Sequence, residues 1–349
     1  MRTTSALLLA VCVLATAGCL AATEEKRTLS PVLEVYNWED YIDPEAVADF
    51  EKEFNVKVHI TTFSDEEEMY ASVQSDPGRY DIVVLTGELA DYMAQSKLIA
   101  ELDLSNIPNV GKVRSEIAMH DPASMYSIPY LWGTTGIIVN RDYIRENVTW
   151  KTLWNPYYRG KLGMLNNRRE VIGAALKMLG YSLSSTDPNQ LAEARAKLVE
   201  QKTYIKGYID PGVLQEMMLS GDLWAAQMYS GDAIIIVDNE SGMNLEYVIP
   251  PEGGSLWVDR FAIPRDSPHK YTAELFIDFM TRPENSARNA VYSGFASPIA
   301  NAEDYMNESF AGDVRIYPPN EVLDKCERFE DIGNANSIYN EIWSEINQE

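Results

Sequence analysis

The chain has 349 residues, and its 53 Asp and Glu residues against 29 Lys and Arg residues give a formal net charge of −24. A field of this sign repels nucleic acid and anionic lipid and attracts cations, so we expect no nucleic-acid partner. Simple solubility explains such a charge equally well, so acidity alone does not identify a ligand. The length exceeds the usual size of one hydrophobic core, which predicts two domains.

Residues 1–18 are predicted to be a signal peptide. Arg2 supplies a positive start, and the apolar run at 6–14 is too short to cross a bilayer as a helix. The small residues that end at Cys19 resemble a bacterial lipobox, which predicts lipid attachment to Cys19 and a tether over 19–30. The alternative is cleavage a few residues later without lipid. Either outcome predicts an extracytoplasmic, periplasmic protein whose membrane contact is limited to such an anchor.

Cysteine usage predicts a mature chain without disulfides. Cys12 lies in the predicted signal peptide and Cys19 would carry lipid, so only Cys326 remains. No intramolecular disulfide and no cysteine-based metal site is therefore expected. The three histidines are far apart in the sequence, and we expect packed or surface residues rather than metal ligands. The sequence predicts no metal and no cofactor.

The first part of the mature chain alternates strand and helix patterns. Asp43 followed by Pro44 is typical of a helix start. Alternating apolar residues predict a half-buried strand, and a continuous apolar run predicts a fully buried one. The elements expected here are strands at 33–38, 56–63 and 81–85 and helices that begin at 44 and cover 66–74. This order predicts a mostly parallel sheet covered by helices, an α/β fold.

The same rhythm resumes in the second part of the chain. We expect strands at 136–140 and 224–228, apolar elements at 233–237 and 247–249, and helices at 171–179, 188–201, 211–219, 271–280 and 283–292. No Gly-rich linker lies near the middle, so crossing strands are expected to join the two domains as a hinge. Ligands in such sheets lie beyond the carboxyl ends of the strands, which places Trp38 and the segments 85–88 and 229–231 near a shared crevice.

An ordered set of segments resembles the spermidine/putrescine-binding proteins of bacterial ABC importers. These segments are 36–41, 126–133, 157–161, 167–171, 253–259, 262–264 and 336–339. The resemblance covers nearly the whole mature chain and implies a two-lobed type II periplasmic-binding-protein fold with the ligand cleft between the lobes. The predicted domains are 31–138 plus 259–305 for lobe 1, and 139–258 plus 306–349 for lobe 2.

The chemistry of a polyamine sets what such a site must contain. Each ammonium group that enters a closed cleft needs carboxylate acceptors, because burying it unpaired costs several kcal/mol. The methylene groups favour aromatic faces, which add about 0.5–2 kcal/mol of cation–π attraction to a nearby ammonium. Carboxylates spaced along a slot walled by Trp and Tyr are therefore expected, without a nucleophile, a metal or a general base.

The resemblance assigns site residues one by one. We predict Asp40, Glu170 and Asp259 as ammonium acceptors and Trp38, Tyr229 and Trp257 as aromatic walls; Tyr41 and Thr86 also match site positions. Structural roles remain open for several of them. Trp257 fits core packing, Tyr41 fits a helix cap, and Asp40 fits a turn. Asp259 before Arg260, and Glu170 after two arginines, also fit ion pairs.

Four positions depart from the family's pattern. Asn167 replaces an Asp, Glu39 a small polar residue, Glu88 a Tyr, and Phe329 a Gln. We still place these residues in the site, which loses one carboxylate and gains two acidic neighbours. Arg168, a small residue in the relatives, could pair with Glu39 or Glu88 or simply face solvent. These departures leave open which polyamine, or which other cation, is preferred.

The predicted function is capture of a polyamine by a monomer that delivers it to an inner-membrane ABC permease. The alternative is a sensor that reports the ligand to a membrane receptor. An enzyme is not expected, because no Gly-x-Ser-x-Gly elbow, catalytic His motif or phosphate-binding loop is present. Paired tyrosines at 157–158 would suit a ferric site, but a turn is the predicted role of this segment.

Overall fold

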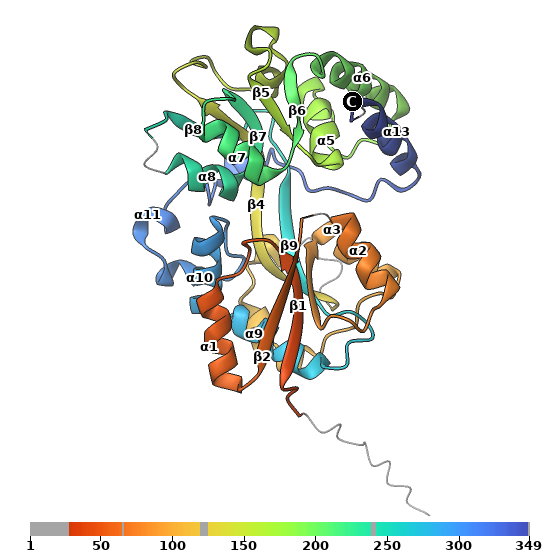
Figure 1. The fold of residues 1–349 in the computed structure, drawn as a ribbon, viewed down its shortest axis with the longest axis vertical. Coiled ribbons are helices and arrows are strands. Elements are labelled where there is room, and N and C mark those ends of the chain that lie inside the picture. Colours follow the sequence, from red (N-terminus) through yellow and green to blue (C-terminus); the bar gives the residue numbers. More distant parts are fainter. Residues whose placement is uncertain (1–27, 65, 119–124, 239–241, 348–349) are drawn as a thin grey trace, which may run out of the picture.

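The computed structural model describes residues 28–64, 66–118, 125–238 and 242–347. The predicted signal peptide at 1–18 and Cys19 lie outside these residues. Two lobes lie one above the other along the long axis, and β4 and β9 run between them (Figure 1). Within the described residues, nine strands form one sheet in the order β2-β1-β3-β9-β4-β7-β5-β6, with β8 paired to β4.

Lobe 1 is built on three parallel strands and the antiparallel β9. Its strands are β1 (Val32–Trp38), β2 (Lys57–Phe63), β3 (Ile82–Thr86) and β9 (Leu256–Ala262). Its longer helices are α1 (Pro44–Phe54), α2 (Glu66–Ser75), α3 (Gly87–Gln95), α9 (Lys270–Met280) and α10 (Pro283–Ser293). Asp43 caps α1 as predicted, since its side chain accepts a hydrogen bond from the Glu45 amide at 2.9 Å.

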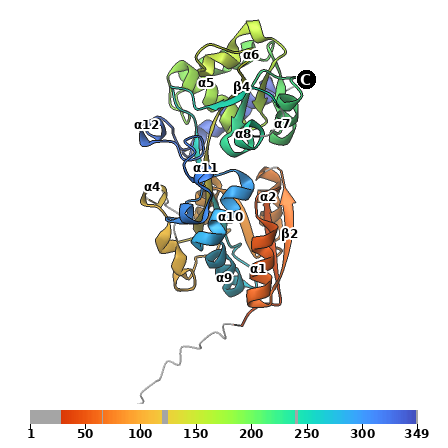
Figure 2. The same cartoon turned by 90° about the vertical axis from the view of Figure 1, so that its left-hand side faces the viewer.

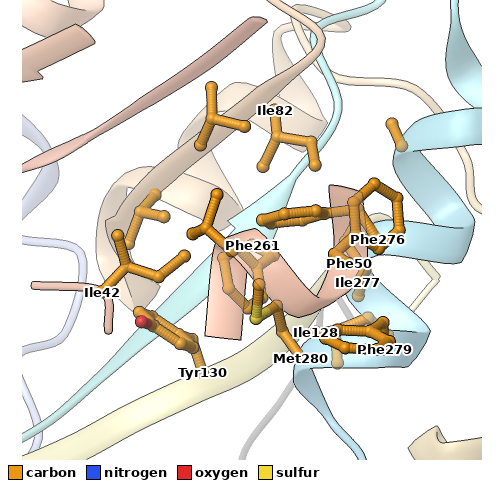
Figure 3. Packing of buried hydrophobic residues seen from close by; sticks show 14 of the residues in the cluster. Ile42, Phe50, Ile82, Ile128, Tyr130, Phe261, Phe276, Ile277, Phe279 and Met280 are labelled. Carbon is orange, nitrogen blue, oxygen red and sulfur yellow. The ribbon is translucent and has the colours of Figure 1, made fainter. Parts of the chain in front are cut away.

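The two faces of this sheet pack against different helices. Side chains alternate between the faces of a strand. Accordingly, Ile82 and Val84 of β3 join one core cluster with α1 and α9, whereas Val83 and Leu85 join another with α2 and α3. Figure 3 shows the first cluster, where Phe50, Phe261 and neighbouring aromatic and aliphatic side chains interdigitate. The paired cores hold the carboxyl ends of β1 and β3 in place.

Lobe 2 repeats this layered arrangement. Its strands are β4 (Ser127–Asn140), β5 (Leu162–Leu165), β6 (Ile205–Ile209), β7 (Ala225–Tyr229) and β8 (Leu245–Val248). Its helices are α5 (Arg168–Leu179), α6 (Pro188–Gln201), α7 (Pro211–Leu219), α8 (Ser230–Val237) and α13 (Asn336–Ile346). One core cluster packs β4 and β5 against α5, α6 and α13, and the other packs the opposite face against α7 and α8.

Short helices fill the connections. They are α4 (Ser115–Ala118), α11 (Glu308–Ala311) and α12 (Asn320–Leu323), with 3-10 turns at Leu104–Asn106, Pro108–Lys112, Trp150–Trp154, Pro156–Tyr158, Ala302–Tyr305 and Gly333–Ala335. Figure 2 shows α11 and α12 near the junction between the lobes. No helix in the described part of the chain is both long enough and apolar enough to cross a bilayer.

The lobes are joined by the strands themselves. The first half of β4 pairs with β9, and its second half pairs with β7 and β8, so one 14-residue strand belongs to both lobes. The expectation of crossing strands at the hinge is confirmed. The expectation of a mostly parallel sheet is wrong at its centre, because β9 runs antiparallel to β3 and β4, and β4 antiparallel to β7.

The division of the chain between the lobes stays a prediction in its detail. Met306 and Phe310, which the sequence assigned to lobe 2, pack against the core cluster of lobe 1. The chain returns to lobe 2 by Ile332, which belongs to the cluster with α13. The crossing in this last segment therefore falls between 310 and 332.

Candidate functional site

The carboxyl ends of strands from both lobes meet beside the crossing strands. Trp38 ends β1, Thr86 ends β3, and Tyr229 ends β7. Thr86 lies opposite Asp259 in the pairing of β3 with β9, and Trp257 lies two residues earlier on β9. This arrangement brings Thr86, Tyr229, Trp257 and Asp259 to the junction of the lobes.

Asp259 is a buried carboxyl group with a neutral partner. Its side chain belongs to a residue only 7% exposed, and its Oδ2 accepts a hydrogen bond of 2.8 Å from the Tyr41 hydroxyl. Burial raises the pKa of Asp259 to about 7, despite the opposing effects of Tyr41 and Arg260. Arg260 makes its ion pair with Asp91, at 3.4 Å. Asp259 is therefore poised to accept a cation.

Aromatic rings form a continuous row beside this carboxyl group. Tyr229 and Trp257 meet edge to face with 5.8 Å between ring centroids, and Trp257 meets Phe295 at 4.9 Å. Phe295 then contacts Tyr41 at 5.6 Å. A Cβ atom at Gly133 would lie 2.5 Å from the Trp257 ring, so glycine at that position allows the ring to lie against β4.

Trp38 belongs to the wall on the lobe 1 side. Its ring lies 4.4 Å from that of Phe63, the last residue of β2. The indole packs against core residues from both faces of the lobe 1 sheet. Trp38 is partly exposed where the strands end.

Glu170 is the buried acid of lobe 2. It lies in the first turn of α5, is only 5% exposed, and accepts hydrogen bonds from the Thr135 hydroxyl at 2.8 Å and the Ser255 hydroxyl at 2.7 Å. Burial raises its pKa to about 7, although both hydrogen bonds oppose this shift. Ser255 and Thr135 lie on the crossing segments, so Glu170 connects α5 to the hinge.

Asn167 caps α5 and also reaches the aromatic row. Its side-chain oxygen accepts from the amides of Arg169 and Glu170 at 3.0 and 3.1 Å, and its Nδ2 donates to the Tyr229 hydroxyl at 3.3 Å. The residue is exposed. At the lobe 2 end of the row the structure thus presents a neutral amide.

Glu88 forms an ion pair across the two lobes. It lies in the first turn of α3 and pairs with Arg169 of α5, whereas the sequence suggested Arg168 as its partner. The Arg169 guanidinium also donates to the Glu330 carbonyl at 2.9 Å and lies 4.8 Å from the Phe329 ring centroid. Burial raises the pKa of Glu88, against the effect of Arg169. Glu88 and Phe329 are therefore engaged with Arg169.

Glu39 and Asp40 lie outside this buried arrangement. Both are exposed in the turn that follows β1, and Asp40 adopts a left-handed backbone with φ of 51°. Among the residues that the structure describes, neither side chain makes a hydrogen bond or an ion pair. The local turn chemistry that the sequence also allowed for Asp40 fits this placement.

Two further acids, both only partly exposed, escaped the sequence analysis. The Oε1 atom of Glu66 accepts from the Thr86 amide at 3.0 Å, and Oδ1 of Asp232 accepts from Gln215 Nε2 at 2.9 Å. Burial raises the pKa of each to about 7, and the charge of Asp259 contributes at Glu66. Each acid lies in the first turn of a helix that follows a strand. This position in the sequence was the feature that could have indicated a place near the site.

The described residues offer no metal centre. No three of their His, Cys, Asp or Glu side chains are grouped so that they could hold a metal ion. The tyrosine pair at 157–158 lies in a 3-10 turn as predicted; Tyr158 is buried and donates to Glu146, whereas Tyr157 faces solvent.

The family of the chain follows from a comparison of its sequence with known families. Residues 45–316 match the model for the bacterial extracellular solute-binding proteins. The chain belongs to this family. Its members are substrate-binding proteins of transport systems outside the cytoplasm, so the chain is an extracytoplasmic binding protein and not an enzyme.

Individual relatives agree over almost the whole chain. The spermidine/putrescine-binding periplasmic protein of Salmonella typhimurium is 32% identical over 316 residues, which cover 89% of this chain and 90% of the relative. The solved structure of the spermidine/putrescine ABC transporter substrate-binding protein from Streptococcus pneumoniae is 32% identical, with a TM-score of 0.80 over 91% of this chain and 98% of that one. A lipoprotein of Treponema pallidum is 27% identical, with a TM-score of 0.83 over 90% and 99%. The predicted two-lobed α/β fold is confirmed.

Proposed function

We propose that this solute-binding protein captures a polyamine, putrescine or spermidine, between its lobes and delivers it to an ABC permease. The observation that carries the proposal is Asp259, which is buried at the hinge, bonded to a neutral phenol, and flanked by the rings of Tyr229 and Trp257. An organic cation with an alkyl chain satisfies both features, because its ammonium pairs with the carboxylate and its methylenes contact the rings. The names of the related proteins support the same ligand class.

Binding in this scheme is coupled to the closure of the lobes. Asp259 and Trp257 lie on β9, whereas Glu170 and Tyr229 come from lobe 2. A ligand that contacts both sets favours the closed arrangement, since it interacts with that arrangement more strongly than with an open one. The permease would recognise the closed shape. A polyamine sensor would need the same site, and no feature of the described residues favours that alternative.

Membrane attachment through Cys19 is part of the proposal. The lipobox-like ending of the leader supports it, as does the description of the Treponema pallidum relative as a lipoprotein. A single N-terminal anchor would keep a monomeric binding domain close to its permease while leaving the lobes free to move. Mass spectrometry of the mature N-terminus tests this part independently of ligand binding.

Calorimetric titration of the purified protein with putrescine, spermidine and spermine tests the ligand. We expect saturable one-to-one binding of at least one of them with a micromolar dissociation constant, about −8 kcal/mol. Asp259→Asn should weaken binding by about 100-fold, because the ammonium loses its charged acceptor. Asp304→Asn, which changes an exposed acid of the same lobe, serves as the control and should bind like the wild type. No heat from any polyamine would remove the ligand claim and leave the family assignment intact.

A further inference from the structure

Glu66 lies across the carboxyl ends of two neighbouring strands. It begins α2 just after β2, and its carboxylate reaches the backbone amide of Thr86, where β3 ends and α3 begins. Hydrogen bonds from the backbone and the side chain of Thr86 oppose the rise in the pKa of this carboxyl group, and no Lys or Arg in the described residues forms an ion pair with it. A partly exposed acid thus borders the site described above.

Asp259 is the neighbour of Glu66 on the other side of Thr86. Thr86 and Asp259 are paired directly in the antiparallel register of β3 and β9. Directly opposed residues place their Cβ atoms about 5 Å apart on one face of a sheet. Thr86 therefore connects the two acids, since its amide donates to Glu66 and its partner across the strands is Asp259, and the charge of Asp259 raises the pKa of Glu66.

The two ends of the aromatic row differ in charge. Asp259, bonded to the Tyr41 hydroxyl, and Glu66, bonded to the Thr86 amide, lie at the end formed by lobe 1 and the hinge. At the lobe 2 end, Asn167 offers an uncharged amide that is bonded to Tyr229. A primary ammonium carries three N–H donors, so one such group can satisfy two carboxylates at once and remove their repulsion.

We propose that Glu66 is a second ammonium acceptor of this site and that it holds one terminal ammonium of the ligand together with Asp259. The proposal deepens the polyamine-binding function and rests on it. The resemblance implies an acid at position 167, where this chain has Asn167. In this proposal the corresponding negative charge is supplied by Glu66, at the opposite end of the ligand. With Glu66, the carboxylates that bind an ammonium group lie at the lobe 1 end of the aromatic row rather than at the lobe 2 end.

Glu66→Gln separates this role from a purely structural one. The amide oxygen of Gln still accepts from the Thr86 amide, so we expect a melting temperature within about 2 °C of the wild type. Titration with putrescine and with spermidine should show at least tenfold weaker binding, because a charged acceptor is lost. Glu68→Gln, an exposed acid on the same helix, is the matched control and should change the dissociation constant less than twofold. Wild-type affinity in Glu66→Gln would overturn the proposal and leave Glu66 as a structural contact.

The double variant Glu66→Gln/Asp259→Asn tests whether the two acids share one ammonium. Groups that bind the same atom are coupled, so the fold-losses of the single variants should not multiply in the double variant. Losses that multiply would mean that the acids act on separate groups, and would overturn the shared-ammonium claim. The wild type is titrated alongside. If the wild type binds no polyamine, the proposed function fails. If the wild type binds and Glu66→Gln binds equally well, only the inference about Glu66 fails.

Discussion

At the scale of single residues, the buried acids differ in what holds them. Glu170 accepts hydrogen bonds from the hydroxyl groups of Thr135 and Ser255, whereas Asp259 accepts one from the Tyr41 hydroxyl. Burial raises both pKa values to about 7. The hydroxyl of Tyr41 opposes the effect of burial on Asp259, so in the proposed function Tyr41 would act on binding through this acid as well as through its ring.

Tyr41→Phe isolates that hydroxyl group. The ring stays in the row with Phe295 and Tyr130, but Asp259 loses a hydrogen bond, so the free energy of unfolding should fall by about 1–2 kcal/mol in urea denaturation. The loss of this donor also raises the pKa of Asp259 further, and polyamine binding near pH 7 should weaken several-fold. Tyr305→Phe, at an exposed ring, is the control. Unchanged binding in Tyr41→Phe would show that Asp259 ionises without this donor.

The sequence identified those site residues that lie in recognisable local motifs. Trp257 and Asp259 share one short segment, and Tyr41 closes another, so their roles could be proposed before the fold was known. Glu66 could not be found in this way, because its place beside the site depends on the Thr86 amide 20 residues later and on the register of β3 with β9. Long-range pairing of this kind is invisible in a local pattern.

At the scale of elements, the N-terminus of α5 and the first turn of α3 hold the lobes together. The contact is the ion pair between Arg169 and Glu88. Arg169 has further partners within lobe 2, namely Ser184, the Glu330 carbonyl and the Phe329 ring. The arginine is thus fixed in lobe 2, and Glu88 is its partner from lobe 1.

Glu88→Gln should weaken lobe closure without unfolding either lobe. The ion pair is partly exposed, so we expect a modest effect: two- to tenfold weaker polyamine binding, and a larger radius of gyration of the ligand-free protein in small-angle scattering. Glu200→Gln removes an exposed ion pair with Lys197 within α6 and serves as the control. A Glu88→Gln variant that matches the wild type in both measurements would exclude a role for this contact in closure.

Helix starts and buried strands were the most predictable elements. Helices 188–201 and 211–219 were placed correctly because Pro stands at the first helical position after Asp. The first half of β4 was not predicted, since Pro129 and Gly133 are poor strand formers and only pairing with β9 makes the segment extended. The apolar run at 233–237 was left undecided between strand and helix, and it forms α8.

At the scale of the whole molecule, four acids with raised pKa values make ligand binding depend on pH. Glu66, Glu170, Asp232 and Asp259 each have a pKa of about 7, well above the unfolded value of about 4. The folded protein therefore binds more protons than the unfolded chain between these values. These groups favour folding at low pH, and their contribution is lost as the pH rises through 7.

The melting temperature of the ligand-free protein should accordingly be several degrees lower at pH 8 than at pH 5.5. A bound ammonium favours the ionised acids, so polyamine affinity should rise from pH 6 to pH 8 with release of protons. Melting curves at the two pH values, and calorimetry in two buffers with different ionisation enthalpies, measure these effects. Added salt should weaken binding. Affinity that falls as the pH rises over this range would contradict the assignment of Asp259 and Glu66 to the ligand.

The strands that join the lobes also carry Trp257 and Asp259. In the proposed function, the hinge about which the lobes move is therefore itself part of the ligand site. An arriving cation meets these two groups at any degree of opening, because rotation about a pivot displaces its own residues least. The cation would then bind first to hinge residues that move little. The closing of the residues farther from the hinge would chiefly set the dissociation rate.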